Sequence, residues 1–117
     1  MATVTSEPEA PTVDAELIAD STEAALRMQL GTSTREDIDA RTRAVTRQLT
    51  QLLAQGLDAD EDAEVTGLFR QGYRLLERVS RPTKQTAAFN AFFYMRDVAN
   101  LARRLLWIYI ESSRHAT

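Results

Sequence analysis

Residues 87–110 read AAFNAFFYMRDVANLARRLLWIYI, and this stretch decides the fold that the sequence predicts. It holds three of the four phenylalanines, two of the three tyrosines and the only tryptophan. Its apolar residues cover well over half of the circumference of a helix. A helix that is apolar around most of its surface packs at the centre of a bundle or against another chain. We therefore expect the rest of the chain to pack around this helix.

The apolar residues of this helix separate into two stripes that are assigned to the core. The first stripe consists of Ala88, Phe92, Met95, Ala99, Ala102, Leu106 and Tyr109. The second stripe consists of Val98, Leu101, Leu105 and Ile108. Neither stripe accounts for a third strip on the polar side, which consists of Phe93, Asn100, Arg103, Arg104 and Trp107.

That third strip is the strongest candidate for a partner interface. Tryptophan and arginine are enriched among the residues that dominate binding energy at interfaces. Trp107 is also spaced to form a cation–π contact with Arg103 or Arg104. Two alternatives remain open: Trp107 covers the end of the core while the arginines are solvated or paired with acidic helices, or the strip binds a ligand.

Helical periodicity predicts three further helices, so that the four span 14–30, 33–55, 59–80 and 83–111. Asp14 is expected to cap the first helix, a capping box of Ser33 and Glu36 the second, and Asp58 or Asp60 the third. Short connections force neighbouring helices antiparallel. The prediction is an all-α, antiparallel up-down four-helix bundle or three helices around the fourth, forming one domain over 13–117 behind a disordered arm over 1–12.

The other three predicted helices each carry an apolar face. The face of the first consists of Leu17, Ile18, Ser21, Ala25 and Met28, and that of the second consists of Ile38, Thr42, Val45, Leu49 and Leu52. In the third helix the apolar stripe runs from Val65 to Val79. Gly72 lies inside this last stripe, where glycine costs about 1 kcal/mol relative to alanine. We expect a neighbouring helix to approach closely at Gly72.

Composition excludes several classes of chemistry. The chain has no cysteine and a single histidine, His115, so thiolate metal sites, cysteine nucleophiles and a histidine base within the fold are not expected. No catalytic, cofactor-binding or metal-binding residue is predicted. Charged residues interrupt the last helix, so no membrane span is expected, and residues 1–12 lack the pattern of a signal peptide. The default expectation is a cytoplasmic protein.

The net charge of −3 conceals a strong asymmetry along the chain. Residues 1–65 carry five basic and fourteen acidic side chains, whereas residues 66–117 carry nine basic and three acidic ones. The two halves can attract one another within one chain or between copies, and they do not by themselves indicate a nucleic-acid partner.

Two further sets of residues are candidate sites. Phe69, Tyr73, Phe92 and Tyr109 are predicted to line a pocket between the last two helices. Arg70, Arg74 and Arg78 recur every four residues and form a basic ridge suited to phosphates. A solvated or intramolecularly paired helix face accounts for the same spacing, and nucleic acid is the less favoured partner.

The last helix resembles a known pattern. Val98-Ala99-Asn100-Leu101-Ala102-Arg103 followed by Trp107-Ile108 resembles V-x-x-L-A-R-x-x-x-W-L, found in small helical actinomycete proteins labelled as natural-product biosynthesis proteins without an assigned activity. Val13-Asp14-x-x-Leu17-Ile18 and Tyr73-Arg74-Leu75 agree with it. The chain departs from it at 47–53, where no Gly-His pair occurs. The resemblance implies an all-α fold and a bacterial cytoplasmic setting, and brings no catalytic residue.

These observations predict a non-enzymatic helical module that binds another protein, or a second copy of itself, through the last helix. One alternative is a small-molecule-binding accessory protein of a natural-product pathway. Another is an accessory nucleic-acid-binding regulator that uses the basic ridge. No cofactor is expected.

Overall fold

The computed structural model describes residues 13–115 and is all-helical, with no strand among those residues, which confirms the predicted fold class. The α-helices are α1 (Ala15–Arg27), α2 (Arg35–Leu53), α3 (Ala63–Leu76) and α4 (Ala88–His115). Two short 3₁₀ helices, η1 (Leu30–Thr32) and η2 (Arg78–Ser80), lie in the connections. The predicted disordered arm over 1–12 falls outside the described residues.

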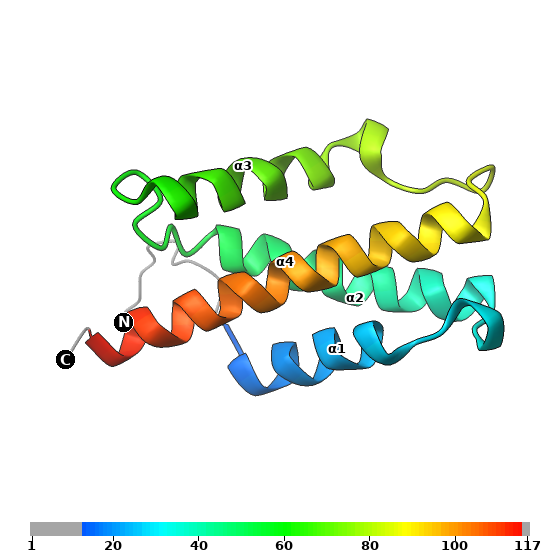
Figure 1. Ribbon diagram of the computed structural model, residues 1–117, viewed down its shortest axis with the longest axis horizontal. Helices are drawn as coiled ribbons and strands as arrows, with labels where there is room; N and C mark the ends of the chain where they lie inside the picture. Colours follow the sequence, from blue (N-terminus) through cyan, green and yellow to red (C-terminus); the bar gives the residue numbers. More distant parts are fainter. Residues whose placement is uncertain (1–12, 116–117) are drawn as a thin grey trace, which may run out of the picture.

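Helix α4 is the centre of the arrangement. It contacts each of the other three helices, most extensively α2 and α1, whereas α1 and α3 make no contact with one another in the described part of the chain. In Figure 1, α4 lies in front of α2 with α1 along one side and α3 along the other, and each helix runs opposite to the one before it. One side of α4 therefore remains uncovered.

The first helix begins where the sequence predicts and ends earlier. Asp14 caps α1, since its carboxylate accepts a hydrogen bond from the backbone N–H of Leu17 at 3.0 Å. Helix α1 ends at Arg27 instead of residue 30, because Met28 is already extended and Leu30–Thr32 form η1. Leu17, predicted to be buried, is exposed, so that part of the first apolar face was wrong.

The capping box of α2 lies one residue later than predicted. Thr34, not Ser33, accepts from the N–H of Asp37 at 3.0 Å, and the N–H of Thr34 donates to the Asp37 carboxylate at 3.3 Å. The sequence contains two overlapping capping boxes, Ser33 with Glu36 and Thr34 with Asp37. The second one forms because an aspartate can make the reciprocal hydrogen bond for which the pattern favours a glutamate.

Helix α3 is shorter than predicted at both ends. Asp62 caps it in place of Asp58 or Asp60. Residues 56–58 all have positive φ, which turns the chain and delays the helix. At the other end, the Ser80 hydroxyl donates to the Arg74 carbonyl and Arg81 Nε to the Leu76 carbonyl, so the last carbonyls of α3 are satisfied without further helix.

The early end of α3 has two consequences. Val79, predicted within the apolar stripe, is 90% exposed. Arg78 falls in η2 after an extended Glu77, so it does not continue the helical row of Arg70 and Arg74. The predicted three-residue basic ridge was therefore wrong.

Helix α4 starts at Ala88, five residues later than predicted, and extends to His115. Thr83 instead starts a side-chain turn, in which its backbone N–H donates to the Thr86 hydroxyl at 2.8 Å. Arg35 of α2 binds the carbonyls of both threonines and so holds this turn outside the helix.

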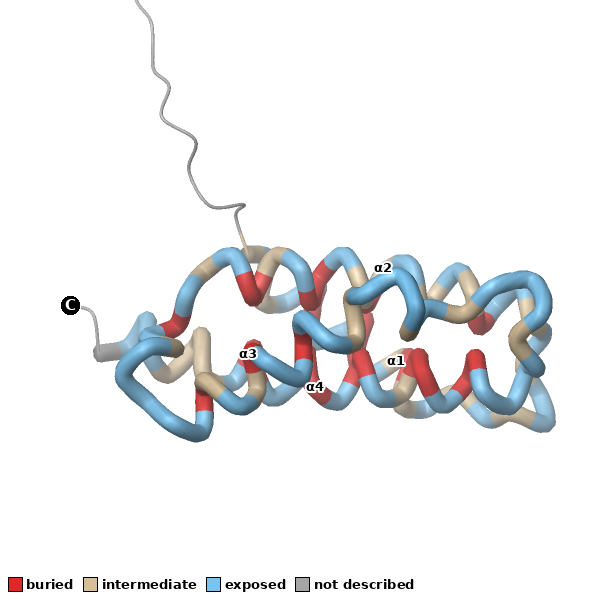
Figure 2. Tube along the Cα trace, turned by 90° about the horizontal axis from the view of Figure 1, so that it is seen from above, coloured by how far each residue is buried: buried red, intermediate tan, exposed pale blue. Residues whose placement is uncertain are grey.

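The core is built largely on α4, as Figure 2 shows by the buried segments along its length and along the inner faces of the other helices. Most of the predicted core residues of α4 are buried; Ala88 is exposed, and Tyr109 and Ile108 are only partly buried. Ala91 and Tyr94 are buried although neither predicted stripe includes them. The buried residues of α4 are Ala91, Phe92, Tyr94, Met95, Val98, Ala99, Leu101, Ala102, Leu105 and Leu106.

Candidate functional site

The uncovered side of α4 carries three large exposed aromatic side chains. Phe89, Phe93 and Trp107 expose 57%, 45% and 58% of their surface. We call this side the outer face of α4, and it consists of Phe89, Phe93, Asp97, Asn100, Arg103, Arg104 and Trp107, all of which are exposed. Single exposed apolar residues are ordinary, whereas several on one helix face indicate an interaction surface.

The phenylalanines form a cluster at the start of this face. The ring centroids of Phe89 and Phe93 are 4.7 Å apart, and those of Phe92 and Phe93 are 5.6 Å apart. Contact with the buried Phe92 thus holds the exposed ring of Phe93 in place, and Phe93 in turn contacts the exposed ring of Phe89. Phe89 is not among the residues predicted to form the third strip, although its spacing of four residues from Phe93 was a usable signal.

Trp107 and Arg104 mark the other end of the outer face. Arg104 forms an ion pair with Glu64 of α3. The cation–π contact in the described residues joins Arg96 and Phe92, at 5.9 Å from guanidinium carbon to ring centroid. The predicted contact of Trp107 with Arg103 or Arg104 is therefore not formed, because Arg104 is directed to the carboxylate of α3 and the Trp107 ring is left exposed.

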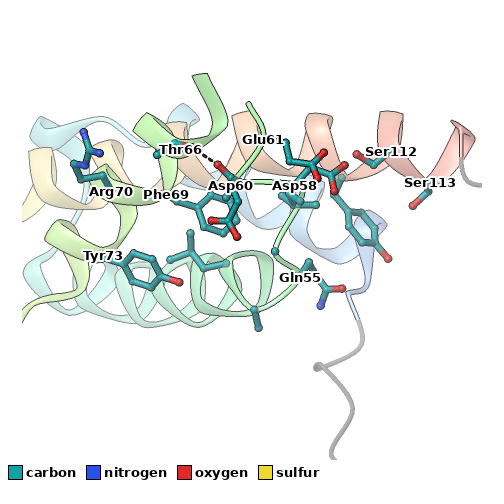
Figure 3. Close-up of a pocket in the computed structure, with 16 residues that line it drawn as sticks. Gln55, Asp58, Asp60, Glu61, Thr66, Phe69, Arg70, Tyr73, Ser112 and Ser113 are labelled. Carbon is teal, nitrogen blue, oxygen red and sulfur yellow. Dashed lines mark hydrogen bonds between the residues drawn. The ribbon is translucent and has the colours of Figure 1, made fainter. Parts of the chain in front are cut away.

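Three of the four predicted pocket residues line one depression. Phe69, Tyr73 and Tyr109 lie in the wall of an open hollow of about 940 Å³ beside the turn that joins α2 to α3 (Figure 3). Phe92 does not line this hollow, since it is buried against Phe93 and Arg96. The edge-to-face contact of Phe69 and Tyr73, with centroids 6.3 Å apart, gives the hollow an aromatic wall.

Polar side chains also line the hollow. They include Asp58, Asp60 and Glu61 from the turn and two serine hydroxyls from the end of α4. The Thr66 hydroxyl donates to the carbonyls of Ala59 and Asp62, which anchors the turn to the start of α3. A lining that combines aromatic rings with carboxylates is suited to a small polar or cationic organic molecule.

A buried phenol lies between α3 and α4. Tyr94 donates a hydrogen bond from its hydroxyl to the Leu75 carbonyl at 2.5 Å. Burial raises the pKa of Tyr94 above the ordinary value of 10.0, an effect that the positive charge of Arg81 and a hydrogen bond with Thr46 oppose. Tyr94 therefore stays protonated at neutral pH and holds the end of α3 against α4.

In the part of the chain that the structure describes, no group of three or more histidine, cysteine, aspartate or glutamate side chains is placed to hold a metal ion. None of the described helices combines the length and the apolar character needed to cross a membrane.

Comparison of the chain with protein-family models, with curated proteins and with solved structures gives no match.

Proposed function

We propose that this protein is a non-enzymatic helical interaction module that pairs with a second copy of itself through the outer face of α4. The observation that carries the proposal is the presence of Phe89, Phe93 and Trp107, about half exposed, on the one side of the central helix that no other helix covers. Covering these rings would remove apolar surface from water and would require no change in the core.

The spacing along α4 favours an antiparallel pair of identical helices. Phe93 and Trp107 each lie seven residues from Asn100. In a two-fold pair centred on Asn100, Phe93 of one copy therefore faces Trp107 of the other, and this contact occurs twice. Asp97, three residues before Asn100, then lies near Arg104 of the second copy, four residues after it.

The same residues also have the chemistry of an interface core. Tryptophan and arginine dominate binding energy at many interfaces, and an aromatic pair adds about 0.5–1.5 kcal/mol beyond the area that it buries. From Phe89 to Trp107 the face is about 27 Å long. An interface of that length is at the small end for specific complexes, so we expect a dissociation constant in the micromolar range.

Sedimentation velocity of the full chain from low to high micromolar concentration tests the proposal. The expected result is a monomer–dimer equilibrium in which a Phe93→Ala, Trp107→Ala variant dissociates about tenfold more readily or worse. The single Trp107 supplies a second readout, since its fluorescence should shift to the blue as concentration rises.

Tyr73→Ala is the matched control, because Tyr73 on α3 is 58% exposed, like Trp107, and lies off the outer face of α4. It should leave the equilibrium unchanged, and all variants should retain their helical circular dichroism. A monomer throughout the concentration range, or equal weakening by the control, would contradict the proposal.

A second candidate function is that of a small-molecule-binding accessory protein, and the aromatic hollow at Phe69, Tyr73 and Tyr109 favours it. Its setting in a natural-product pathway rests on the resemblance of residues 98–108 to actinomycete proteins. Titration with benzylamine, an aromatic cation that matches the rings and carboxylates of the hollow, should perturb the amide chemical shifts of Gly56, Tyr73 and Tyr109 together. Shifts scattered over the surface, or none at millimolar benzylamine, would count against this candidate.

A further inference from the structure

A second depression lies on α2, away from both surfaces described above. It has a volume of about 800 Å³, with α2 on one side and the connection from η2 to α4 on the other. Five of its twelve lining residues are cationic and one is acidic. The lining residues are Arg35, Asp39, Thr42, Arg43, Thr46, Arg47, Thr50, Arg81, Pro82, Thr83, Lys84 and Tyr94.

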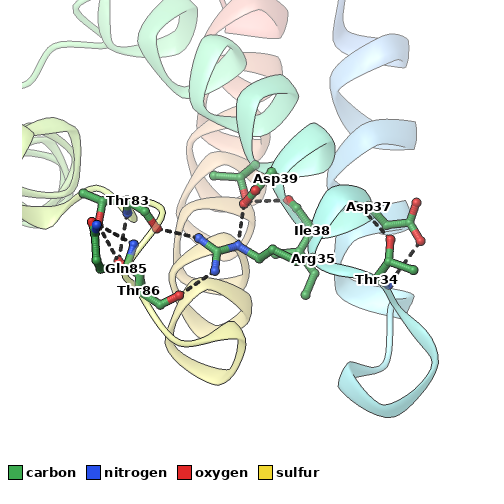
Figure 4. Close-up of polar contacts among 9 residues, drawn as sticks. Thr34, Arg35, Asp37, Ile38, Asp39, Thr83, Gln85 and Thr86 are labelled. Atoms are coloured by element: carbon green, nitrogen blue, oxygen red, sulfur yellow. Dashed lines mark hydrogen bonds and ion pairs between the residues drawn. The ribbon is translucent and has the colours of Figure 1, made fainter.

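One cation of this groove has a structural role. Arg35 donates to the Asp39 carboxylate at 2.9 Å and to the carbonyls of Thr83, at 2.8 Å, and of Thr86 (Figure 4). These bonds tie residues 83–86 to the first turns of α2. The distance between the two walls of the groove is thereby set before any ligand arrives.

None of the other four cations has a carboxylate partner among residues 13–115. Arg43, Arg47 and Lys84 form no hydrogen bond or ion pair within the described residues. Arg81 uses only its Nε, which donates to the Leu76 carbonyl at 3.0 Å, so its two terminal amino groups remain free. The full chain has more acidic than basic residues, yet the only carboxylate in the groove, Asp39, is paired with Arg35.

Such a cluster is unfavourable without a ligand. Arg43 and Arg47 are one helical turn apart on α2, a spacing at which like charges repel. Arg81 and Lys84 add positive charge from the opposite wall. An anion between the walls would replace this repulsion by attraction, and guanidinium groups bind phosphate oxygens in a bidentate manner.

We propose that this groove binds the oligophosphate group of a small molecule, through Arg43 and Arg47 on α2 and Arg81 and Lys84 on the opposite wall. Four free cations match the charge of two or three linked phosphates better than that of a single phosphate. Nucleic acid is less favoured, because single-strand binders stack bases on exposed aromatic rings, and the ring that lines this groove, Tyr94, is buried. This inference does not depend on the proposed self-association.

Calorimetric titration of the full chain with inorganic triphosphate at low salt tests the proposal. Saturable binding is expected, with inorganic monophosphate much weaker. An Arg43→Gln, Arg47→Gln variant should weaken triphosphate binding about tenfold or more. Both side chains are exposed and unpaired, so the variant should keep its fold, which circular dichroism verifies.

Arg70→Gln, Arg74→Gln is the matched control, since it removes two exposed arginines with the same spacing from α3, outside the groove. Triphosphate binding should change less than about twofold in this control, apart from weak long-range screening effects. Titration with ATP shows which part of a ligand the groove recognises. Equal affinity for ATP and triphosphate would mean that only the phosphates are recognised, and tighter binding of ATP would mean that the nucleoside is recognised as well.

Three results would overturn the proposal. The first is absence of triphosphate binding at millimolar concentration and low salt. The second is an equal loss in the groove variant and the α3 control, which would indicate nonspecific attraction. The third is binding of a single-stranded oligonucleotide with far higher affinity than triphosphate and with a steeper dependence of that affinity on salt. This result would identify the groove as a nucleic-acid site.

Discussion

The side chain of Leu53 in α2 lies against the backbone of Gly72 in α3. A β-carbon added to Gly72 would come within 3.1 and 3.2 Å of the two methyl groups of Leu53 and within 3.4 Å of a methyl group of Leu101 in α4. The three helices thus meet where α3 has no side chain. This contact lets the short α3 pack on α2 and α4, and it confirms the close approach that the position of Gly72 within an apolar stripe predicts.

Gly72 and Gly67 should respond oppositely to alanine, although both lie in α3. Gly67→Ala meets nothing within 4 Å and should raise the free energy of unfolding by about 0.5–1 kcal/mol through helix propensity. Gly72→Ala should not show this gain, because the added β-carbon would lie within 3.2 Å of the methyl groups of the buried Leu53, which must move aside. Urea unfolding followed by circular dichroism measures both, and equal stabilisation by the two substitutions would refute the close contact.

Arg35→Gln should destabilise the protein by about 1–2 kcal/mol, since it removes charge-assisted hydrogen bonds that hold residues 83–86 to α2. Arg27→Gln is the control: Arg27 forms only an exposed ion pair with Glu23, and its loss should change stability by about 0.5 kcal/mol or less. Hydrogen exchange should quicken at residues 83–87 in Arg35→Gln alone. Unchanged exchange there would show that the turn does not depend on Arg35.

The stability of the protein should fall as pH rises above about 10. The pKa of Tyr94 is raised by burial in the folded state, so the unfolded chain loses this proton first, and deprotonation then favours unfolding. Stability is not lost below the pKa that Tyr94 has in the unfolded chain. Above that value stability falls until the pH passes the higher pKa of Tyr94 in the folded protein. Urea unfolding at a series of pH values from about 8 to about 11 measures the slope.

Tyr94→Phe should flatten this decline and should cost about 1 kcal/mol at neutral pH, because the hydrogen bond to the Leu75 carbonyl is lost. Tyr73→Phe, which alters an exposed phenol, should leave the slope as it is. A decline of the same steepness in Tyr94→Phe would show that other groups cause it.

Gln48→Met should stabilise the protein by about 1 kcal/mol. The Gln48 side chain is buried in α2, and its Oε1 atom has no hydrogen-bond partner in the described structure, so an apolar side chain of similar length avoids a desolvation cost. Gln48→Glu should be clearly destabilising, because it buries a charge at the same position. Thermal unfolding of both variants provides the measurement, and a loss of stability in Gln48→Met would reveal a partner for Gln48 that this arrangement does not contain.

Local side-chain chemistry explains which features were predictable. The aspartate cap at Asp14, the close approach at Gly72 and the central position of the last helix all follow from residue type and periodicity over a few turns. The same rules misplaced other boundaries by one to five residues. Ser33 and Thr34 are equivalent as local caps, so the sequence does not distinguish between them. The last helix does not begin at Thr83 as predicted, because Arg35, which is 48 residues away, binds the Thr83 carbonyl.

The candidate sites divide in the same way. Exposure of Phe93 and Trp107 follows from their common helix face, since residues seven apart return to the same side of a helix. The groove cations could not be found in this manner, because Arg43 and Arg47 belong to one helix and Arg81 and Lys84 to a connection that follows another. The apparent ridge of Arg70, Arg74 and Arg78 failed because Arg78 leaves the helix.

By itself, then, the sequence determined an all-helical chain with α4 as its most apolar element, since amphipathic periodicity and capping act within a few residues. Only the tertiary structure decided where helices end, which aromatic rings remain in water and which cations lie together without counter-charges. Those properties depend on contacts such as Arg35 with Thr83 and Tyr94 with Leu75, which join segments that are distant along the chain and close in space.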